Sequence, residues 1–150
     1  MRLVIQRVTE ATLSIEGREH AAISQGLVVL IGVTHDDTTE DVDYLVSKLV
    51  AMRIFNDDEG KMNRSLEEVN GSLLLVSQFT LHASTKKGNR PSYIKAARPE
   101  LALSLYEKFV AACQTLLPNR TKTGVFGAAM KISLTNDGPV TILIDSKVRD

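Results

Sequence analysis

The sequence predicts an α+β protein, a single domain over residues 1–150 with a largely antiparallel, barrel-like sheet and two main helices. Apolar segments typical of strands open and close the chain, and two amphipathic helical patterns lie between them. No repeating strand–helix–strand rhythm occurs, which argues against a parallel α/β sheet. A chain of 150 residues with 43% hydrophobic content has the size of one globular unit with a single core.

The first 34 residues indicate a run of strands, at 2–15, 21–23 and 27–34. Gly17, within the sequence EGREH, suits a hairpin turn. The sequence SQG at 24–26 marks a second reversal of the chain.

Two segments carry apolar residues at helical spacing. The first covers 40–53, and its apolar positions are Val42, Leu45, Val46, Leu49 and Val50. The second covers 99–117, where Pro99 suits a first helical position and Pro118 ends the helix. The apolar stripe of this second helix consists of Ala102, Tyr106, Phe109, Cys113 and Leu116.

Three segments around these helices have distinct compositions. FNDDEGKMNRS at 55–65 predicts a polar loop, and SLLLVSQF at 72–79 predicts a short strand buried on both faces. The segment 80–100 is too polar and too rich in turn-forming residues for regular structure.

The C-terminal segment combines two alternating runs. Met130, Ile132 and Leu134 alternate with polar residues, and PVTILID follows at 139–145. The intervening TNDGPVT contains an Asn-Asp-Gly run typical of a two-residue turn, so a terminal hairpin is predicted. Pro139 fits that turn poorly, because proline donates no hydrogen bond to a ladder and restricts the residue before it.

The charge balance argues against a partner attracted by net charge alone, so a nucleic-acid role would need a local basic patch. Eighteen basic residues oppose 18 acidic ones, so no overall field draws the protein to nucleic acid or to an anionic membrane. The longest apolar runs fall far short of the ~20 residues that span a bilayer, and Arg2, Arg7 and Glu10 interrupt any signal peptide. We expect a cytoplasmic protein without membrane or DNA partners.

Few side chains are arranged for metal or covalent chemistry. The three histidines, His20, His35 and His82, fit no metal-ligand spacing, and no phosphate-binding glycine loop is present. We therefore expect no metal and no cofactor, and interpret each histidine as an ordinary loop or strand-end residue. Cys113 lies on an apolar helix stripe, which indicates a buried, inert thiol rather than a nucleophile.

SQFTL at 77–81 places polar side chains where an apolar strand ends. Rigid scaffolds present catalytic and binding groups at strand ends, so Ser77, Gln78 and Thr80 are candidates. The alternative is that Ser77 and Thr80 only cap the strand. Thr80 has no evident base beside it, and backbone N–H groups of this turn would suit an oxyanion hole.

The segment 83–98, here called the basic loop, has a one-sided charge. It contains no acidic residue, and its basic residues are Lys86, Lys87, Arg90, Lys95 and Arg98. In a chain without net charge they form a local patch suited to a few phosphates rather than a long duplex. A solvated loop is the alternative interpretation.

SQFTL and TNDGPVT, together with GVFGAAMKISL before the latter, resemble the D-aminoacyl-tRNA deacylase family. The similarity runs along the whole chain, from MRLVIQRV through NRPSY to the C-terminal segment. It implies a homodimeric enzyme that hydrolyses the ester between a D-amino acid and the tRNA 3′ end, and so keeps D-residues out of translation. The active site is implied to lie at the dimer interface.

The resemblance also assigns roles to residues. The pocket for the aminoacyl group and terminal adenosine is implied to be lined by Ser77, Gln78, Phe79 and Thr80. Two further residues, Phe126 and Met130, match positions near the terminal adenosine. Gly138 and Pro139 match a Gly-cis-Pro element, the chiral selector, which enters the partner subunit's pocket, and Arg7 matches the arginine that holds it. In the basic loop we expect Lys86, Lys87 and Arg90 to meet tRNA phosphates.

The selector implied by the resemblance explains Pro139. Proline lowers the cost of a cis peptide to about 0.5–1 kcal/mol, and the carbonyls of Gly138 and Pro139 then both face outward. They would accept hydrogen bonds from the substrate ammonium group and leave no volume for an L-side chain. Glycine escapes such exclusion, so activity on glycyl-tRNA, including glycine mischarged on the alanine tRNA, is expected.

The mechanism and the function each leave alternatives open. Either Thr80 is the nucleophile, or the 2′-hydroxyl of the terminal ribose activates water while amides near Phe79 and Thr80 hold the oxyanion, and the second route is favoured. One rival function is a non-catalytic RNA-binding module that uses the basic loop. Another is a small-molecule esterase that uses Thr80 and His82.

Overall fold

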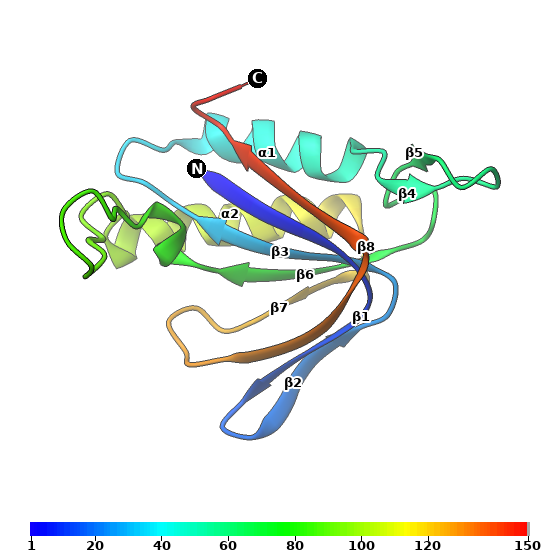
Figure 1. Cartoon of the computed structure of the whole chain (residues 1–150), viewed down its shortest axis with the longest axis horizontal. Coiled ribbons are helices and arrows are strands. Elements are labelled where there is room, and N and C mark those ends of the chain that lie inside the picture. The colour runs from blue at the N-terminus through cyan, green and yellow to red at the C-terminus, as the bar shows by residue number, and fades with distance from the viewer. Residues whose placement is uncertain (150) are drawn as a thin grey trace.

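The computed structural model of the chain describes residues 1–149. In chain order, its elements are β1 (Arg2–Ile15), β2 (Arg18–Ile23), β3 (Gly26–Gly32), α1 (Thr39–Ala51), β4 (Phe55–Asn56), β5 (Met62–Arg64), β6 (Ser72–Ser77), the 3₁₀ turn η1 (Phe79–His82), α2 (Pro99–Leu116), β7 (Thr121–Thr123) and β8 (Lys131–Asp145). Figure 1 shows one strongly curved sheet with both helices on the same face. The predicted α+β class with two helices and a barrel-like sheet is confirmed.

The main sheet is organised around β1. Along one edge, this 14-residue strand pairs with β3 and then with β2, and along the other edge it pairs with β8, always antiparallel. The β3–β6 and β6–β7 pairs are parallel, so the sheet is mixed. The carboxyl ends of β3 and β6 therefore lie side by side at one edge of the molecule.

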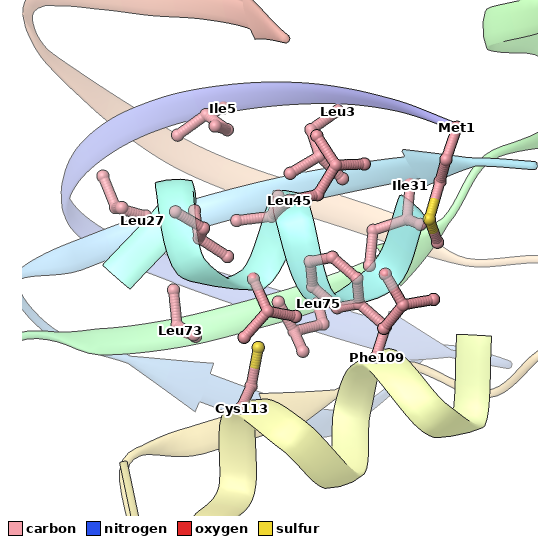
Figure 2. Packing of buried hydrophobic residues seen from close by; sticks show 14 of the residues in the cluster. Met1, Leu3, Ile5, Leu27, Ile31, Leu45, Leu73, Leu75, Phe109 and Cys113 are labelled. Atoms are coloured by element: carbon pink, nitrogen blue, oxygen red, sulfur yellow. The ribbon is translucent and has the colours of Figure 1, made fainter. Parts of the chain in front are cut away.

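Both helices bury one face against the sheet, as their periodicity predicts. The buried residues of α1 and α2 include Val42, Leu45, Val46, Leu49, Leu105, Tyr106, Phe109 and Cys113. Figure 2 shows Leu45, Phe109 and Cys113 meeting in this core. Burial raises the pKa of the Cys113 thiol to about 12, as suits an inert core residue.

The predicted apolar stripe of α2 is wrong at its last residue, Leu116. Leu116 is 50% exposed, whereas Leu117 is buried. The helix ends at Leu116, and Leu117 leaves helical geometry as its C-cap, which turns that side chain into the core.

The strand predicted to be buried on both faces is β6. Leu73 and Leu75 pack under the helices, while Leu74 and Val76 join a second apolar cluster on the other face of the curved sheet. This double burial fixes β6 firmly, and with it the SQFTL segment that follows.

The predicted terminal hairpin is wrong, because β8 is one long strand. Its first part pairs with Val8–Ser14 and its last part pairs with Arg2–Gln6, so both runs lie along β1 and not against each other. Residues 137–140 bulge out of the ladder between these parts, opposite Arg7. The local sequence pattern is the same for a hairpin and for a strand bulged against a long partner.

Two short elements also differ from the sequence prediction. The polar loop at 55–65 contains the β4–β5 hairpin, and β7 was not predicted at all. Strands of two or three residues carry too little alternation to be recognised. None of the helices in residues 1–149 is both long and apolar enough to cross a membrane.

Candidate active site

An apolar pocket of about 580 Å³ opens where β3 and β6 end. We call it the strand-end pocket, and it is lined by Ile31, Val33, Val76, Ser77, Gln78, Phe79, Tyr93, Ala96, Ala97, Pro99, Ala102, Phe126, Gly127, Ala128, Met130 and Ile132. A concave, mostly apolar lining with a few polar groups is typical of a small-molecule site. The double burial of β6 holds one wall of this pocket rigidly.

SQFTL contributes that wall. Ser77, Gln78 and Phe79 line the pocket, and Phe79 is 55% exposed at its rim. The Gln78 N–H donates to the Ile31 carbonyl over 2.7 Å, which ties the start of the turn to β3. As the first residues of a 3₁₀ turn, Phe79 and Thr80 have no acceptor for their N–H groups within it.

Thr80 is placed beside the pocket and not in its lining. Its hydroxyl oxygen accepts a hydrogen bond from the Gln78 side-chain amide. Among residues 1–149 no hydrogen bond joins Thr80 to His82, whose ring lies under the turn against Gly32. The Thr80–His82 pair that an esterase would need is therefore not assembled.

The opposite wall brings Phe126 and Met130 into the same pocket. The Phe126 ring packs on Tyr106 with ring centroids 5.9 Å apart, and the Tyr106 hydroxyl donates to the Leu75 carbonyl over 3.2 Å. Tyr93 meets Phe79 edge to face at 5.1 Å. The sequence analysis assigned Tyr93 no role, although it ends the NRPSY segment that resembles the family.

Gly138 and Pro139 lie in the 137–140 bulge, are exposed, and do not line the pocket of their own chain. The peptide between them is cis. The Arg7 guanidinium, which is buried, donates to the Asp137 carbonyl over 3.0 Å and to the Ile54 carbonyl over 2.8 Å. Arg7 thus ties the bulge to the β4 side of the fold.

The basic loop leads into α2 and has little regular structure. Lys86, Lys87 and Arg90 are exposed, and none of them forms an ion pair within residues 1–149. No three His, Cys, Asp or Glu side chains in the same described range come together as a metal site would require. The free cations are available to a polyanion.

Because His82 is buried, we expect the protein to lose stability on acidification. Burial lowers the pKa of its imidazole below the usual 6.5; Arg2 and the Met1 ammonium group act in the same direction, while the Gly32 carbonyl and Asp37 oppose them. The unfolded chain takes up this proton as the pH falls through about 6.5, and the folded chain does so only at its lower pKa. Acidification within that window therefore favours unfolding.

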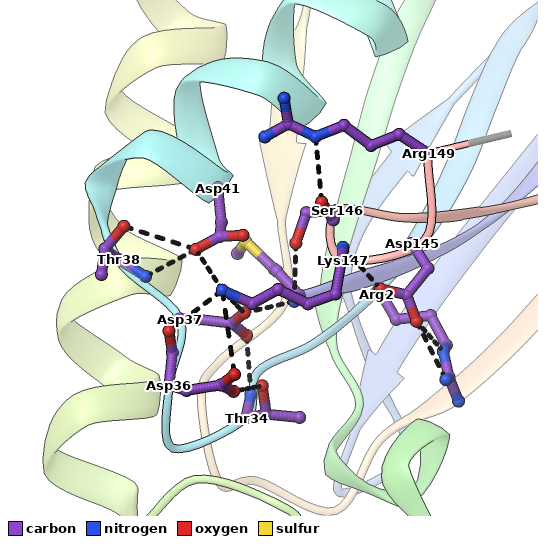
Figure 3. A network of polar contacts seen from close by, with 11 residues as sticks. Arg2, Thr34, Asp36, Asp37, Thr38, Asp41, Asp145, Ser146, Lys147 and Arg149 are labelled. Atoms are coloured by element: carbon purple, nitrogen blue, oxygen red, sulfur yellow. Dashed lines mark hydrogen bonds and ion pairs between the residues drawn. The ribbon is translucent and has the colours of Figure 1, made fainter.

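We expect the melting temperature to fall between about pH 7.5 and about pH 5, and to fall less in His82→Gln. The exposed His20→Gln variant is the matched control and should follow the unmodified protein. Burial of Asp41 (Figure 3) alone would raise its pKa, but Ser146, the Thr38 N–H and the Lys147 ammonium group stabilise its carboxylate and bring the pKa to about 2, below this window. Identical pH profiles for all three proteins would contradict this role of His82.

The fold and the pocket define a class: a small α+β protein with an apolar pocket at the ends of two parallel strands. The family model described as D-Tyr-tRNA(Tyr) deacylase matches residues 4–145. A D-aminoacyl-tRNA deacylase of Cytophaga hutchinsonii is 62% identical over 147 residues, which is 98% of both chains, and one of Akkermansia muciniphila is 57% identical over 150 residues, all of both chains. The chain belongs to the D-Tyr-tRNA(Tyr) deacylase family.

Two solved structures have a similar fold. The c-Myc DNA Unwinding Element Binding Protein superposes with a TM-score of 0.92 at 37% identity, covering 97% of this chain and 98% of that one. A probable eukaryotic D-amino acid tRNA deacylase superposes with a TM-score of 0.83 at 20% identity, covering 95% and 97%, and this second likeness supports the fold alone.

Proposed function

We propose that this protein hydrolyses the ester bond of D-aminoacyl-tRNA, releasing the D-amino acid and tRNA, and rejects L-aminoacyl-tRNA. The observation that carries the proposal is the strand-end pocket. This pocket brings Ser77, Gln78 and Phe79 together with Phe126 and Met130, and the chain belongs to the deacylase family. Its apolar walls suit an aromatic or aliphatic side chain and a nucleobase.

The selector acts from a second subunit in this proposal. The 137–140 bulge is exposed and is not among the lining residues of the pocket of its own chain, which supports a role at the pocket of another copy. A symmetric homodimer supplies such an arrangement twice. Sedimentation should show a dimer at assay concentration, and a fully active monomer would contradict this arrangement.

Discrimination rests on backbone in this proposal. The Gly138 and Pro139 carbonyls receive the substrate ammonium group and deny space to an L-side chain. Glycyl-tRNA, including glycine mischarged on the alanine tRNA, is then a substrate as well, because glycine has no side chain to exclude.

Hydrolysis needs little more than positioning, since an aminoacyl ester is already activated. The Phe79 and Thr80 N–H groups, which have no acceptor within η1, would hold the oxyanion, and the 2′-hydroxyl of the terminal ribose would activate water. Among residues 1–149 no base is hydrogen-bonded to the Thr80 hydroxyl, which serves to orient Gln78 through their hydrogen bond.

Thr80→Ala tests this division of roles. We expect the variant to keep at least about a third of the single-turnover rate, whereas loss of a covalent nucleophile costs about 10³-fold or more. Thr115→Ala, an exposed change on α2, is the control. A loss of about 10³-fold in Thr80→Ala with the fold intact would establish covalent catalysis instead.

The basic loop is proposed to contact tRNA phosphates. Replacing Lys86, Lys87 and Arg90 together by alanine should weaken tRNA binding and reduce the slope of log affinity against log salt by about 2 to 3, at ~0.7–0.9 per contact. The matched control replaces three exposed lysines elsewhere: Lys48, Lys61 and Lys108. Equal slopes for the two triple variants would show that the basic loop does not contact tRNA phosphates and is only a solvated loop.

One assay separates the proposed function from its rivals. Purified protein is incubated with D-tyrosyl-tRNA, L-tyrosyl-tRNA and D-tyrosine ethyl ester. We expect rapid hydrolysis of the first alone. Binding without hydrolysis would support an RNA-binding module, and equal attack on all three esters would support a general esterase.

A further inference from the structure

Arg2 connects three segments of the fold that lie far apart in the sequence. Its Nη1 donates to the Leu81 carbonyl over 2.8 Å, within the η1 turn. Its Nε and Nη2 donate to Asp145 Oδ2 over 3.1 and 2.9 Å (Figure 3). Because guanidinium is a planar fork of donors, the bond to Asp145 fixes the direction in which Nη1 points.

The strand register explains why η1 lies within reach of this arginine. Arg2 pairs with Asp145 on β8 and with Gly32 on β3. Cross-strand partners face the same side of a sheet, and a Cβ atom at Gly32 would lie 2.9 Å from Leu81 Cβ and 3.0 Å from the His82 ring. The turn therefore rests directly on the backbone of β3 at this register.

The turn itself has few bonds of its own. The Leu81 and Ala83 N–H groups donate to the Gln78 and Thr80 carbonyls over 3.3 and 3.0 Å. Such short 3₁₀ pieces have poor hydrogen-bond geometry, so an external anchor matters for them. Resting on the proposed function, we infer that Arg2, oriented by Asp145, is a positioning residue that fixes the η1 amides toward the substrate ester.

Arg7 holds the 137–140 bulge in the way that Arg2 holds the η1 turn. Both arginines come from β1, and each donates to a backbone carbonyl of the segment that it holds, Leu81 for Arg2 and Asp137 for Arg7. Each also forms an ion pair with an aspartate of β8. One strand thus positions both the hydrolytic turn of its own pocket and the bulge offered to the partner.

The test compares Arg2→Ala, Arg2→Lys, Asp145→Asn and the control Arg64→Ala, which removes an exposed ion pair in the β4–β5 hairpin. Single-turnover hydrolysis of D-tyrosyl-tRNA is measured at temperatures well below each melting point. We expect Arg2→Ala to lower the saturating rate by about tenfold or more, given that a ~1 Å misplacement can cost ~10²-fold. The half-saturating concentration should change less than about threefold, because phosphate contacts dominate affinity.

The single-turnover rates of the other variants are expected to be intermediate or low. Arg2→Lys and Asp145→Asn each keep part of the anchor, so their rates should lie between Arg2→Ala and the control. Gly32→Ala, whose Cβ would displace Leu81, should reproduce the rate defect with Arg2 in place. Hydrogen exchange at the Leu81 and Ala83 amides should be faster in Arg2→Ala than in Arg64→Ala.

Two results would overturn the inference, and each is distinct from failure of the proposed function. A saturating rate in Arg2→Ala equal to that of Arg64→Ala is one, and unchanged exchange at the Leu81 amide is the other. If Arg2→Ala did not fold, Arg2→Lys and Asp145→Asn would decide in the same way. If the unmodified protein did not hydrolyse D-tyrosyl-tRNA, the proposed function would fail, and the exchange measurement alone would decide on the anchor.

Discussion

Replacing Arg7 by alanine is expected to lower the single-turnover rate on D-tyrosyl-tRNA by about 100-fold, the size of effect that ~1 Å of displacement produces. The guanidinium is the donor to the Asp137 carbonyl, so its loss frees the 137–140 bulge. It also leaves the buried Ile54 carbonyl without its side-chain donor, at a cost of about 1–3 kcal/mol. The remaining activity should discriminate less between D- and L-tyrosyl-tRNA.

Arg64→Ala is the matched control for Arg7→Ala, since it removes an arginine from an exposed ion pair. Rates on both enantiomers and melting curves are measured for the two variants. An Arg7→Ala protein that keeps the full ratio of D- to L-hydrolysis would show that the bulge holds its position without this residue.

Gly138→Ala should have an effect of similar size, about 100-fold on D-tyrosyl-tRNA, through displacement of the same bulge. An added Cβ would lie 2.8 Å from Val140 Cγ2, 3.1 Å from the Val140 nitrogen and 3.2 Å from Arg7 Nη2. The backbone at Gly138 also has φ +133°, which L-residues rarely adopt. The bulge must therefore move, and Arg7 must move with it.

Gly60→Ala separates local backbone strain from the effect on the site. Gly60 also has positive φ, at +77°, but an added Cβ there meets nothing within 4 Å. It lies in the β4–β5 hairpin, so its variant should lose some stability and keep its rate. Equal rates in Gly138→Ala and Gly60→Ala would show that the position of the bulge does not affect hydrolysis.

The sequence predicts both helices well because amphipathic periodicity is strong in segments of 13 and 18 residues. It fails at β8 because alternation is a local signal, whereas pairing depends on a partner elsewhere in the chain. β1 is long enough to pair with both halves of β8, and nothing within TNDGPVT reveals this. The same ambiguity hides β7, which has three residues.

The candidate site is predicted unevenly for a related reason. SQFTL follows a fully apolar strand, and the structure places Ser77, Gln78 and Phe79 in the pocket. The roles of Tyr93 and Arg2 are not predicted from the sequence, because each depends on a contact with a distant segment. Tyr93 contacts Phe79, and Arg2 donates to the Leu81 carbonyl. Long-range contacts of single side chains leave no periodic trace in a sequence.

In the proposed function, the backbone at Gly138 and Pro139 rejects L-substrates by exclusion, and three aminoacyl esters can test this. Single-turnover rates are measured on glycyl-, D-alanyl- and L-alanyl-tRNA at matched enzyme concentration. We expect rapid hydrolysis of the glycyl and D-alanyl esters and resistance of the L-alanyl ester, which differs from the glycyl ester by one methyl group. Glycyl-tRNA as resistant as L-alanyl-tRNA would contradict exclusion and point to a pocket that grips the D-side chain.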